Sequence, residues 1–152
     1  MTTFRIHAEP IQDQWLDAYG HLNEAYYLVP FSNATWAFQE HFDIGVAYFD
    51  TTGGAMYTAE SHVRYLADVR APAQIEIETM VLACDAKRLH FAHAMWVGDS
   101  MRATFECLAI HFDSRAERTA PLPGAAQRAL TQICLPQSDW PDWIGRRISM
   151  QR

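Results

Sequence analysis

The sequence predicts an α+β fold in which one long helix packs against a mostly antiparallel sheet. Apolar residues recur every three or four positions in the early part of the chain, which is the period of a helix. They recur every second position in four later runs, which is the period of a strand. With 152 residues, 49% of them hydrophobic, the chain can bury a core of its own. We therefore expect a single domain over residues 1–152, with an irregular tail from about residue 136.

The long helix is expected to begin just after Asn23 and to end near His41. Its apolar stripe is formed by Leu28, Phe31, Thr35, Phe38 and Phe42. Asn23 is a good N-cap, and Glu24 follows in the first turn, where the helix dipole favours a negative charge. Pro30 lacks the N–H that a helix interior needs, so we expect either a kink there or a helix whose regular part starts close to it.

A short extended start and four strands complete the expected sheet. The four runs cover residues 56–65, 75–83, 89–97 and 101–112, and their side chains alternate between two faces. Gly98 and Asp99 supply a hairpin turn, and we expect these strands to be antiparallel neighbours. The segment from Pro123 to Leu135 has apolar residues on one side and predicts a terminal helix.

Charge, hydropathy and cysteine content exclude several classes of function. A net charge of −6 and a sequence pI near 5.5 argue against nucleic acid as a partner. No stretch has the roughly 18 uninterrupted apolar residues of a membrane span, and the first residues lack the apolar core of a signal peptide. We expect a cytoplasmic protein without membrane contact. Cys84, Cys107 and Cys134 lack the spacing of a zinc site or disulfide framework and are expected in the core.

The strongest metal-like motif is the pair His90 and His93. Residues three apart on a strand point to opposite faces, so the pair would not converge on one ion, and no metal site is expected. The sequence also has no G-x-S-x-G for a serine hydrolase and no G-x-G-x-x-G for a dinucleotide.

One segment carries a family motif. The residues D-A-Y-G-H-L-N-E-A-Y-Y, starting at Asp17, resemble the D-x-x-G-H-x-N-x-x-x-Y signature of the 4-hydroxybenzoyl-CoA thioesterase branch of hotdog proteins. Further on, E-S-H-V-R-Y-L-A-D-V-R, D-A-K-R-L-H and the terminal G-R-R-I are similar to thioesterases of carnitine breakdown, which hydrolyse betainyl-CoA.

This resemblance implies a hotdog fold, in which the sheet wraps around the long helix. It implies hydrolysis of a small acyl-CoA thioester, with betainyl-CoA as a candidate, to the free acid and CoA. It also implies no cofactor apart from the CoA of the substrate, and a homodimer or homotetramer with active sites between protomers. An open sheet edge and a helix that covers only one face of the sheet likewise favour association.

The resemblance also assigns roles near the start of the helix. Asp17 takes the position of the catalytic carboxylate, as nucleophile or general base. The backbone N–H of Glu24 takes that of the oxyanion donor, at a helix start where N–H groups lack partners. Further catalytic contacts are expected from His21 and Asn23, and substrate contacts from Tyr19, Gly20 and Tyr27. For Asp17, Gly20 and His21, the alternative is a purely structural role in the turn.

Three charged residues outside the motif are further candidates for substrate contact. Glu60 lies in mid-strand between apolar neighbours, where a buried carboxylate needs a partner. Lys87 and Arg88 precede the third long strand, where the family places basic residues that bind the phosphates of CoA. A solvated hairpin is the alternative for this pair.

Aromatic residues around Asp17 would suit a trimethylammonium group through cation–π contacts. They are Trp15, Tyr19, Tyr26, Tyr27 and Trp36, and ordinary core positions are the alternative for most of them.

Two other functions compete with thioester hydrolysis. A hotdog acyl-CoA hydratase pairs an Asp with a His five residues later in a D-x-N-P-x-H pattern, whereas His21 follows Asp17 by four residues and Gly20 interrupts the pattern. A non-catalytic acyl-CoA binding module would keep the pocket but tolerate loss of Asp17.

Overall fold

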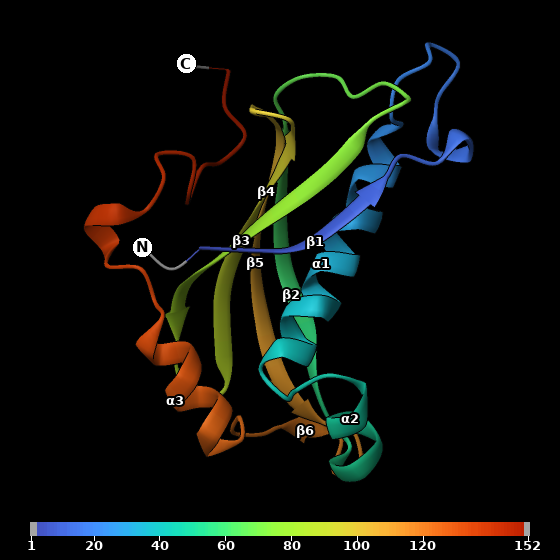
Figure 1. Ribbon diagram of the computed structural model, residues 1–152. Helices are drawn as coiled ribbons and strands as arrows, with labels where there is room; N and C mark the ends of the chain where they lie inside the picture. Colours follow the sequence, from blue (N-terminus) through green and yellow to red (C-terminus); the bar gives the residue numbers. More distant parts are fainter. Residues whose placement is uncertain (1–2, 151–152) are drawn as a thin grey trace.

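The computed structural model describes residues 3–150, which form a curved antiparallel sheet with a long helix along one side (Figure 1). The strands are β1 (Thr3–Pro10), β2 (Gly54–Tyr65), β3 (Gln74–Cys84), β4 (Arg88–Val97), β5 (Ser100–Asp113) and β6 (Arg118–Thr119). The helices are η1 (Asp13–Trp15), η2 (Glu24–Tyr27), α1 (Leu28–His41), α2 (Val46–Thr52), α3 (Gly124–Gln132) and η3 (Gln137–Asp139). The expected α+β hotdog layout is confirmed.

The strand order corrects one expectation about pairing. The order is β1-β3-β4-β5-β2, with β6 attached to β5, so β2 pairs with β5 and not with its successor β3. Residues 66–73 carry the chain from one edge of the sheet across to β3. The two-residue period identifies each strand and its faces but contains no information on its partner. The hairpin turn at Gly98 is as expected, with Val97 opposite Ser100.

The helix begins in two steps. The Asn23 side chain accepts the Ala25 N–H at 3.0 Å and caps the short helix η2, which continues directly into α1 at Leu28. Pro30 is the third residue of α1, within the first turn, where a missing N–H costs no hydrogen bond. The regular helix therefore starts close to Pro30, which confirms the second of the two expectations for this proline. The short helix α2 was not predicted.

The main core lies between α1 and the inner face of the sheet. Phe31, Ala34 and Phe38 of α1 are buried against it. Facing them are buried side chains of the three central strands, Ile75, Ile77, Leu89, Phe91, Met95 and Phe105. In the part of the chain described, no helix is long and apolar enough to cross a membrane.

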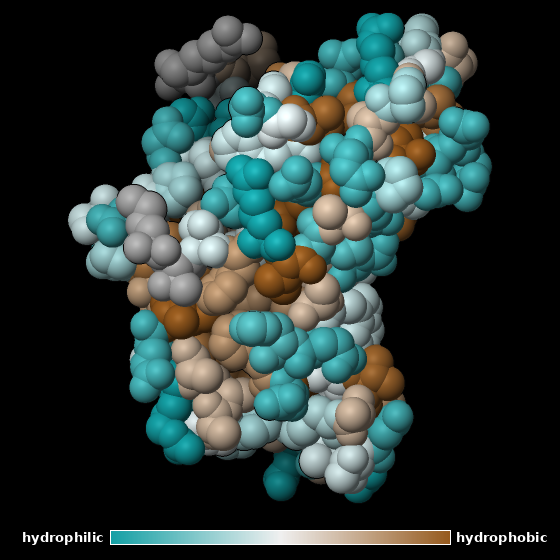
Figure 2. Space-filling view, in the orientation of Figure 1, coloured by the Kyte–Doolittle hydropathy of each residue, from teal (hydrophilic) through white to brown (hydrophobic). Residues whose placement is uncertain are grey.

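A second apolar cluster covers the opposite face of the sheet. In Figure 1, α3 and the tail lie on the side of the sheet away from α1. Figure 2 shows apolar side chains gathered over α3 and the adjoining strands. Leu135 and Trp143 of the tail pack with the buried side chains of Met80, Leu82, Ala92 and Ala94. The argument that one helix leaves the second face of the sheet uncovered is therefore wrong, because the chain covers part of that face itself.

Candidate functional site

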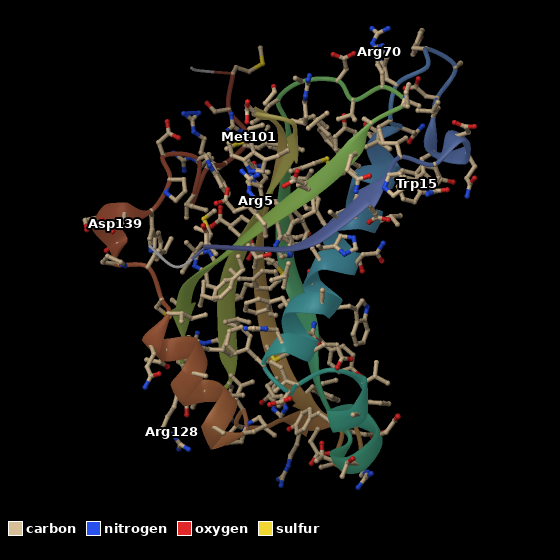
Figure 3. All side chains as sticks on the ribbon, in the orientation of Figure 1. Arg5, Trp15, Arg70, Met101, Arg128 and Asp139 are labelled. Atoms are coloured by element: carbon tan, nitrogen blue, oxygen red, sulfur yellow. The ribbon has the colours of Figure 1, made fainter. Side chains whose placement is uncertain are left out.

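Three of the motif residues, Asp17, His21 and Tyr27, line a groove of about 400 Å³ at one end of the sheet, whereas Gly20 and Asn23 do not. Asp17 and His21 come from the loop before the helix, Glu24 from the helix start, and Tyr65 and Asp68 from the end of β2 and the segment after it. The loop is held in place by the Leu22 N–H, which donates to the Val69 carbonyl at 2.7 Å. Arg70 and Trp15, labelled in Figure 3, lie at this end of the molecule.

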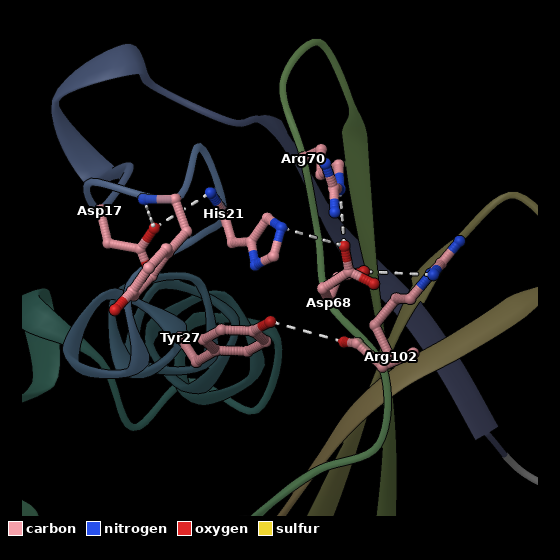
Figure 4. A network of polar contacts seen from close by, with 8 residues as sticks. Asp17, His21, Tyr27, Asp68, Arg70 and Arg102 are labelled. Carbon is pink, nitrogen blue, oxygen red and sulfur yellow. Dashed lines mark hydrogen bonds and ion pairs between the residues drawn. The ribbon is translucent and has the colours of Figure 1, made fainter.

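The Asp17 carboxylate organises the turn that carries it. Its Oδ1 accepts the backbone N–H of Tyr19 at 2.8 Å and of His21 at 3.2 Å (Figure 4). Within residues 3–150, its Oδ2 has no hydrogen-bond partner. Gly20 has a φ of +76°, and a Cβ added there would meet no atom within 4 Å, so the turn needs glycine for its backbone conformation rather than for space. One oxygen thus holds the half-buried side chain in place and the other stays available.

The Glu24 N–H is left without an acceptor by the way the helix is capped. The Asn23 side chain accepts a hydrogen bond from the Ala25 N–H, and the Asn23 backbone carbonyl accepts one from the Tyr26 N–H at 2.9 Å. No acceptor among the described residues is bonded to the Glu24 N–H. It is an unsatisfied donor at the positive end of a helix, where an anionic oxygen is favoured.

A polar network links the loop to the segment after β2 (Figure 4). His21 Nε2 lies 3.5 Å from Asp68 Oδ2, and Arg70 Nε donates to the same oxygen at 2.7 Å. Arg102 Nη1 donates to the Asp68 backbone carbonyl at 3.1 Å. The hydrogen bond from Arg70 lowers the pKa of the Asp68 carboxyl, which therefore stays ionised beside His21. Asp68 was not among the candidates, although it lies in the R-Y-L-A-D-V-R segment.

Two tyrosines form the wall of the groove near Glu24. Tyr27 is buried, and its hydroxyl lies 3.5 Å from the Ala67 carbonyl. The Tyr65 ring packs nearly perpendicular to the Tyr27 ring with 5.0 Å between centroids, and the Tyr65 hydroxyl donates to the Glu24 carbonyl at 3.2 Å. Burial raises the pKa of Tyr65, which keeps its hydroxyl a donor at neutral pH. Tyr65 was also missed, since it lies about forty positions beyond the motif.

The other aromatic candidates do not converge on Asp17. Trp15 is buried and stacks on Tyr26 with 6.2 Å between centroids. Tyr19 is 83% exposed, and its side chain does not line the groove. Trp36 lines a different groove, between α1 and β2. The expected aromatic cluster around Asp17 is thus reduced to Tyr27.

Glu60 lies outside the Asp17 groove, and its expected burial is wrong. The side chain is exposed, because β2 is an end strand of the sheet. It lines a separate groove of about 410 Å³, with His62, His90, Glu106, Arg146 and Arg147 among its other lining residues. Whether a strand lies at the edge depends on the sheet order, which the residues flanking Glu60 do not specify.

Lys87 and Arg88 lie at the other end of the sheet from Asp17. β3 runs from the groove end to their hairpin over eleven residues, about 35 Å at the usual rise of a strand. Asp85 builds the hairpin by accepting the N–H groups of both residues and the Arg88 Nε at 2.7 Å. The hydrogen bond from Arg88 lowers the pKa of Asp85 to about 2. The Lys87 ammonium has no ion-pair partner within residues 3–150.

The two histidines of the metal-like pair point to opposite faces, as expected. His90 bonds Glu106 at 2.8 Å and contacts Trp140 of the tail, whereas His93 is buried against Phe31 of α1. Among residues 3–150, no three His, Cys, Asp or Glu side chains form a group that could hold a metal ion.

Comparison with known proteins identifies the family to which this chain belongs. The thioesterase-like superfamily matches residues 11–130. The betainyl-CoA thioesterase of Pseudomonas aeruginosa is 34% identical over 157 residues, covering 99% of this chain and 95% of that protein. The L-carnitine dehydrogenase/betainyl-CoA thioesterase of Agrobacterium fabrum is 35% identical over 150 residues, and the chain spans 31% of that longer protein. The structure of a Staphylococcus aureus protein in complex with CoA shares the fold, with a TM-score of 0.86, 19% identity, and coverage of 97% and 94% of the two chains.

Proposed function

Since the chain belongs to the thioesterase-like superfamily, we propose that it hydrolyses a small acyl-CoA thioester, betainyl-CoA in particular, to the free acid and CoA. The observation that carries this proposal is that Asp17, with one free carboxylate oxygen, lines the same groove as Glu24, whose N–H has no acceptor within the described chain. The names of the two curated relatives support betainyl-CoA as the substrate.

In this reaction, Asp17 acts on the carbonyl carbon and the Glu24 N–H acts on the carbonyl oxygen. The free Asp17 oxygen attacks the carbonyl carbon to form a transient anhydride, or removes a proton from a water that attacks it. The carbonyl oxygen becomes negative and accepts a hydrogen bond from the Glu24 N–H. The C–S bond then breaks, and CoA leaves as the thiolate and takes up a proton. When water is the nucleophile, this step gives the free carboxylate directly. On the anhydride route, a water then hydrolyses the anhydride, which releases the acyl group as a carboxylate and restores the Asp17 carboxylate. Asn23, Gly20 and His21 hold the loop in this geometry, and Tyr19 lies at its exposed rim.

A thiol-release assay tests the activity and the substrate together. We expect the highest kcat/KM with betainyl-CoA in a panel that also contains acetyl-, octanoyl- and benzoyl-CoA. A preference for the aromatic or the medium-chain ester would contradict the substrate and leave the reaction standing. Absence of thiol release from every ester would contradict the reaction itself.

The distance between the hairpin and Asp17 has a consequence for assembly. We propose that a CoA ester that contacts both groups uses the Lys87 hairpin of a second copy, because in one chain the two groups are separated by the length of β3, about 35 Å. Within the described residues, the twelve-residue strand β2 pairs only with β5, so the backbone groups on its outer edge are a template for pairing with another strand. We therefore assign the protein a homodimeric or larger state, with sites shared between copies and Glu60 near the shared edge.

Light scattering during size exclusion checks this state. We expect a mass at least twice the 17.4 kDa of one chain at assay concentration. A monomer that retains full activity would contradict the shared site.

The Lys87–Arg88 hairpin is expected to contribute to the affinity for CoA esters. Replacing Lys87 and Arg88 by Ala is expected to raise KM for CoA esters by about threefold to tenfold, since exposed phosphate contacts are lost, with little change in kcat. The wild-type KM should also rise with salt. The matched control is Arg128→Ala, an exposed arginine on α3. If an N-acetylcysteamine thioester, which lacks the nucleotide, shows the same penalty, the hairpin does not bind phosphate.

The cysteines support a reducing location. All three are free thiols, and burial raises the pKa of Cys84 and Cys107 to about 11, so neither is a reactive thiolate. This favours the cytoplasm as the site of action.

A further inference from the structure

The groove beside Asp17 has an acidic lining. The carboxylate-bearing residues Asp17, Glu24 and Asp68 contribute to it, whereas no Lys or Arg of the described chain does. Arg70 pairs with the Asp68 carboxylate and Arg102 donates to the Asp68 backbone carbonyl, both from outside the groove, so these two cations offset part of the negative charge. An acidic lining is unfavourable for an anionic acyl group and favourable for a cationic one.

The Tyr65 ring is fixed in place beside this lining. One end of its side chain is held by the hydrogen bond from its hydroxyl to the Glu24 carbonyl, and the ring packs nearly perpendicular to that of buried Tyr27. The residue remains 50% exposed at the groove. An exposed aromatic ring held in this way can bind a cation without further loss of side-chain freedom.

Tyr65 lies close enough to the oxyanion donor to contact the cation of a short acyl group. In a betainyl ester, a single methylene separates the quaternary nitrogen from the carbonyl carbon, so the cation must bind next to the oxyanion donor. Tyr65 is bonded to Glu24, the residue that supplies this donor. Trp36 lies twelve residues further along the helical segment, about 18 Å away at the usual helical rise, and is too far for this contact.

We propose that Tyr65 determines the acyl specificity of this site by binding the quaternary ammonium of a short cationic acyl group against its ring. The inference rests on the proposed thioesterase function and adds the residue that selects the substrate class. The Asp17, Glu24 and Asp68 side chains contribute the surrounding negative potential.

The test compares two esters of equal size and different charge. Betainyl-CoA carries the trimethylammonium, and 3,3-dimethylbutanoyl-CoA carries a neutral tert-butyl group in its place. We expect the wild-type kcat/KM for the charged ester to exceed that for the neutral ester by about tenfold or more. In Tyr65→Leu, this ratio should fall by about threefold to thirtyfold, which is the range of a desolvated cation–π contact.

Two further variants distinguish the contribution of the Tyr65 ring from that of its hydroxyl and from general effects of substitution on β2. Tyr65→Phe keeps the ring and should retain most of the ratio, and fluorinated phenylalanines at position 65 should lower it stepwise as the ring face loses electron density. Tyr57→Leu is the matched control, because Tyr57 lies on the same strand with an exposure of 49% and does not line the groove.

The outcomes distinguish the two proposals. A ratio that is unchanged in Tyr65→Leu and across the fluorinated series, with both esters hydrolysed, would overturn the role of Tyr65 and leave the thioesterase standing. Absence of hydrolysis of any acyl-CoA by the wild-type protein would overturn the proposed function, and the specificity with it.

Discussion

Asp17→Asn lowers kcat for acyl-CoA hydrolysis by about 10³-fold, while affinity for CoA stays within about twofold. Asparagine keeps an oxygen that can accept the N–H groups of Tyr19 and His21, so the turn is preserved. The substitution removes only the negative oxygen that attacks the thioester or activates water. Single-turnover thiol release gives the rate, and calorimetry with CoA gives the affinity.

Asp113→Asn is the matched control for this experiment. Asp113 also uses one carboxylate oxygen to accept two backbone N–H groups, those of Arg115 and Ala116, but it does so at the far end of β5. It should leave turnover unchanged. Equal loss of turnover and CoA affinity in Asp17→Asn would indicate a structural role, and normal turnover would indicate that Asp17 is not the catalytic carboxylate.

Acid should destabilise the protein through His93, which is buried in the core. Its Nδ1 lies 2.9 Å from the Thr79 hydroxyl and its Nε2 lies 3.0 Å from that of Thr35. Because Thr35 donates its own proton to the Phe31 carbonyl, Nε2 is the donor in that contact, and in a neutral imidazole Nδ1 accepts from the Thr79 hydroxyl. Burial lowers the pKa of His93 from 6.5 to about 3.

The sign of the pH effect follows from this shift. Above about pH 6.5 both the folded and the unfolded forms hold a neutral imidazole, and the stabilisation is complete. Between about pH 6.5 and 3 only the unfolded form takes up the proton, so the free energy of unfolding attributable to His93 falls by about 1.4 kcal/mol per pH unit. Urea unfolding at a series of pH values measures this slope.

The variant His93→Asn should abolish this contribution to the slope. It should also lose about 2–4 kcal/mol at pH 7, because one threonine hydroxyl is left unpaired and a cavity opens. The control is His41→Asn, an exposed histidine at the end of α1, which should retain the wild-type slope. An identical slope in wild type and His93→Asn would show that other groups govern the acid sensitivity.

The elements that depend on local sequence could be predicted, and their pairing could not. Asn23 and Pro30 marked the helix start because a cap and a first-turn proline act within a few residues. The four strands followed from side-chain alternation. The partner of β2 depends on where residues 66–73 lead the chain, and α2 has only seven residues, too few for a periodic signal.

The same division holds for the candidate site. Asp17 and Glu24 are seven positions apart, so the motif contained both. Tyr65 and Asp68 reach the groove only because the end of β2 folds back against the helix start, as the contact between Tyr65 and Glu24 shows. The proposed role of Lys87 in CoA binding requires a second copy of the chain, whose placement the fold of one chain does not determine.

The apolar tail has a consequence for how many copies can come together. Trp143 and Leu135 occupy the outer face of the sheet, and the Gly145 N–H fastens the tail there by donating to Glu106 at 2.8 Å. Back-to-back stacking of two sheets would have to displace these residues and expose Met80 and Leu82. The tail thus disfavours association of two copies through the outer faces of their sheets. If the proposed homo-oligomer forms, we expect its contacts at the outer edge of β2 or on the helix side rather than on this face.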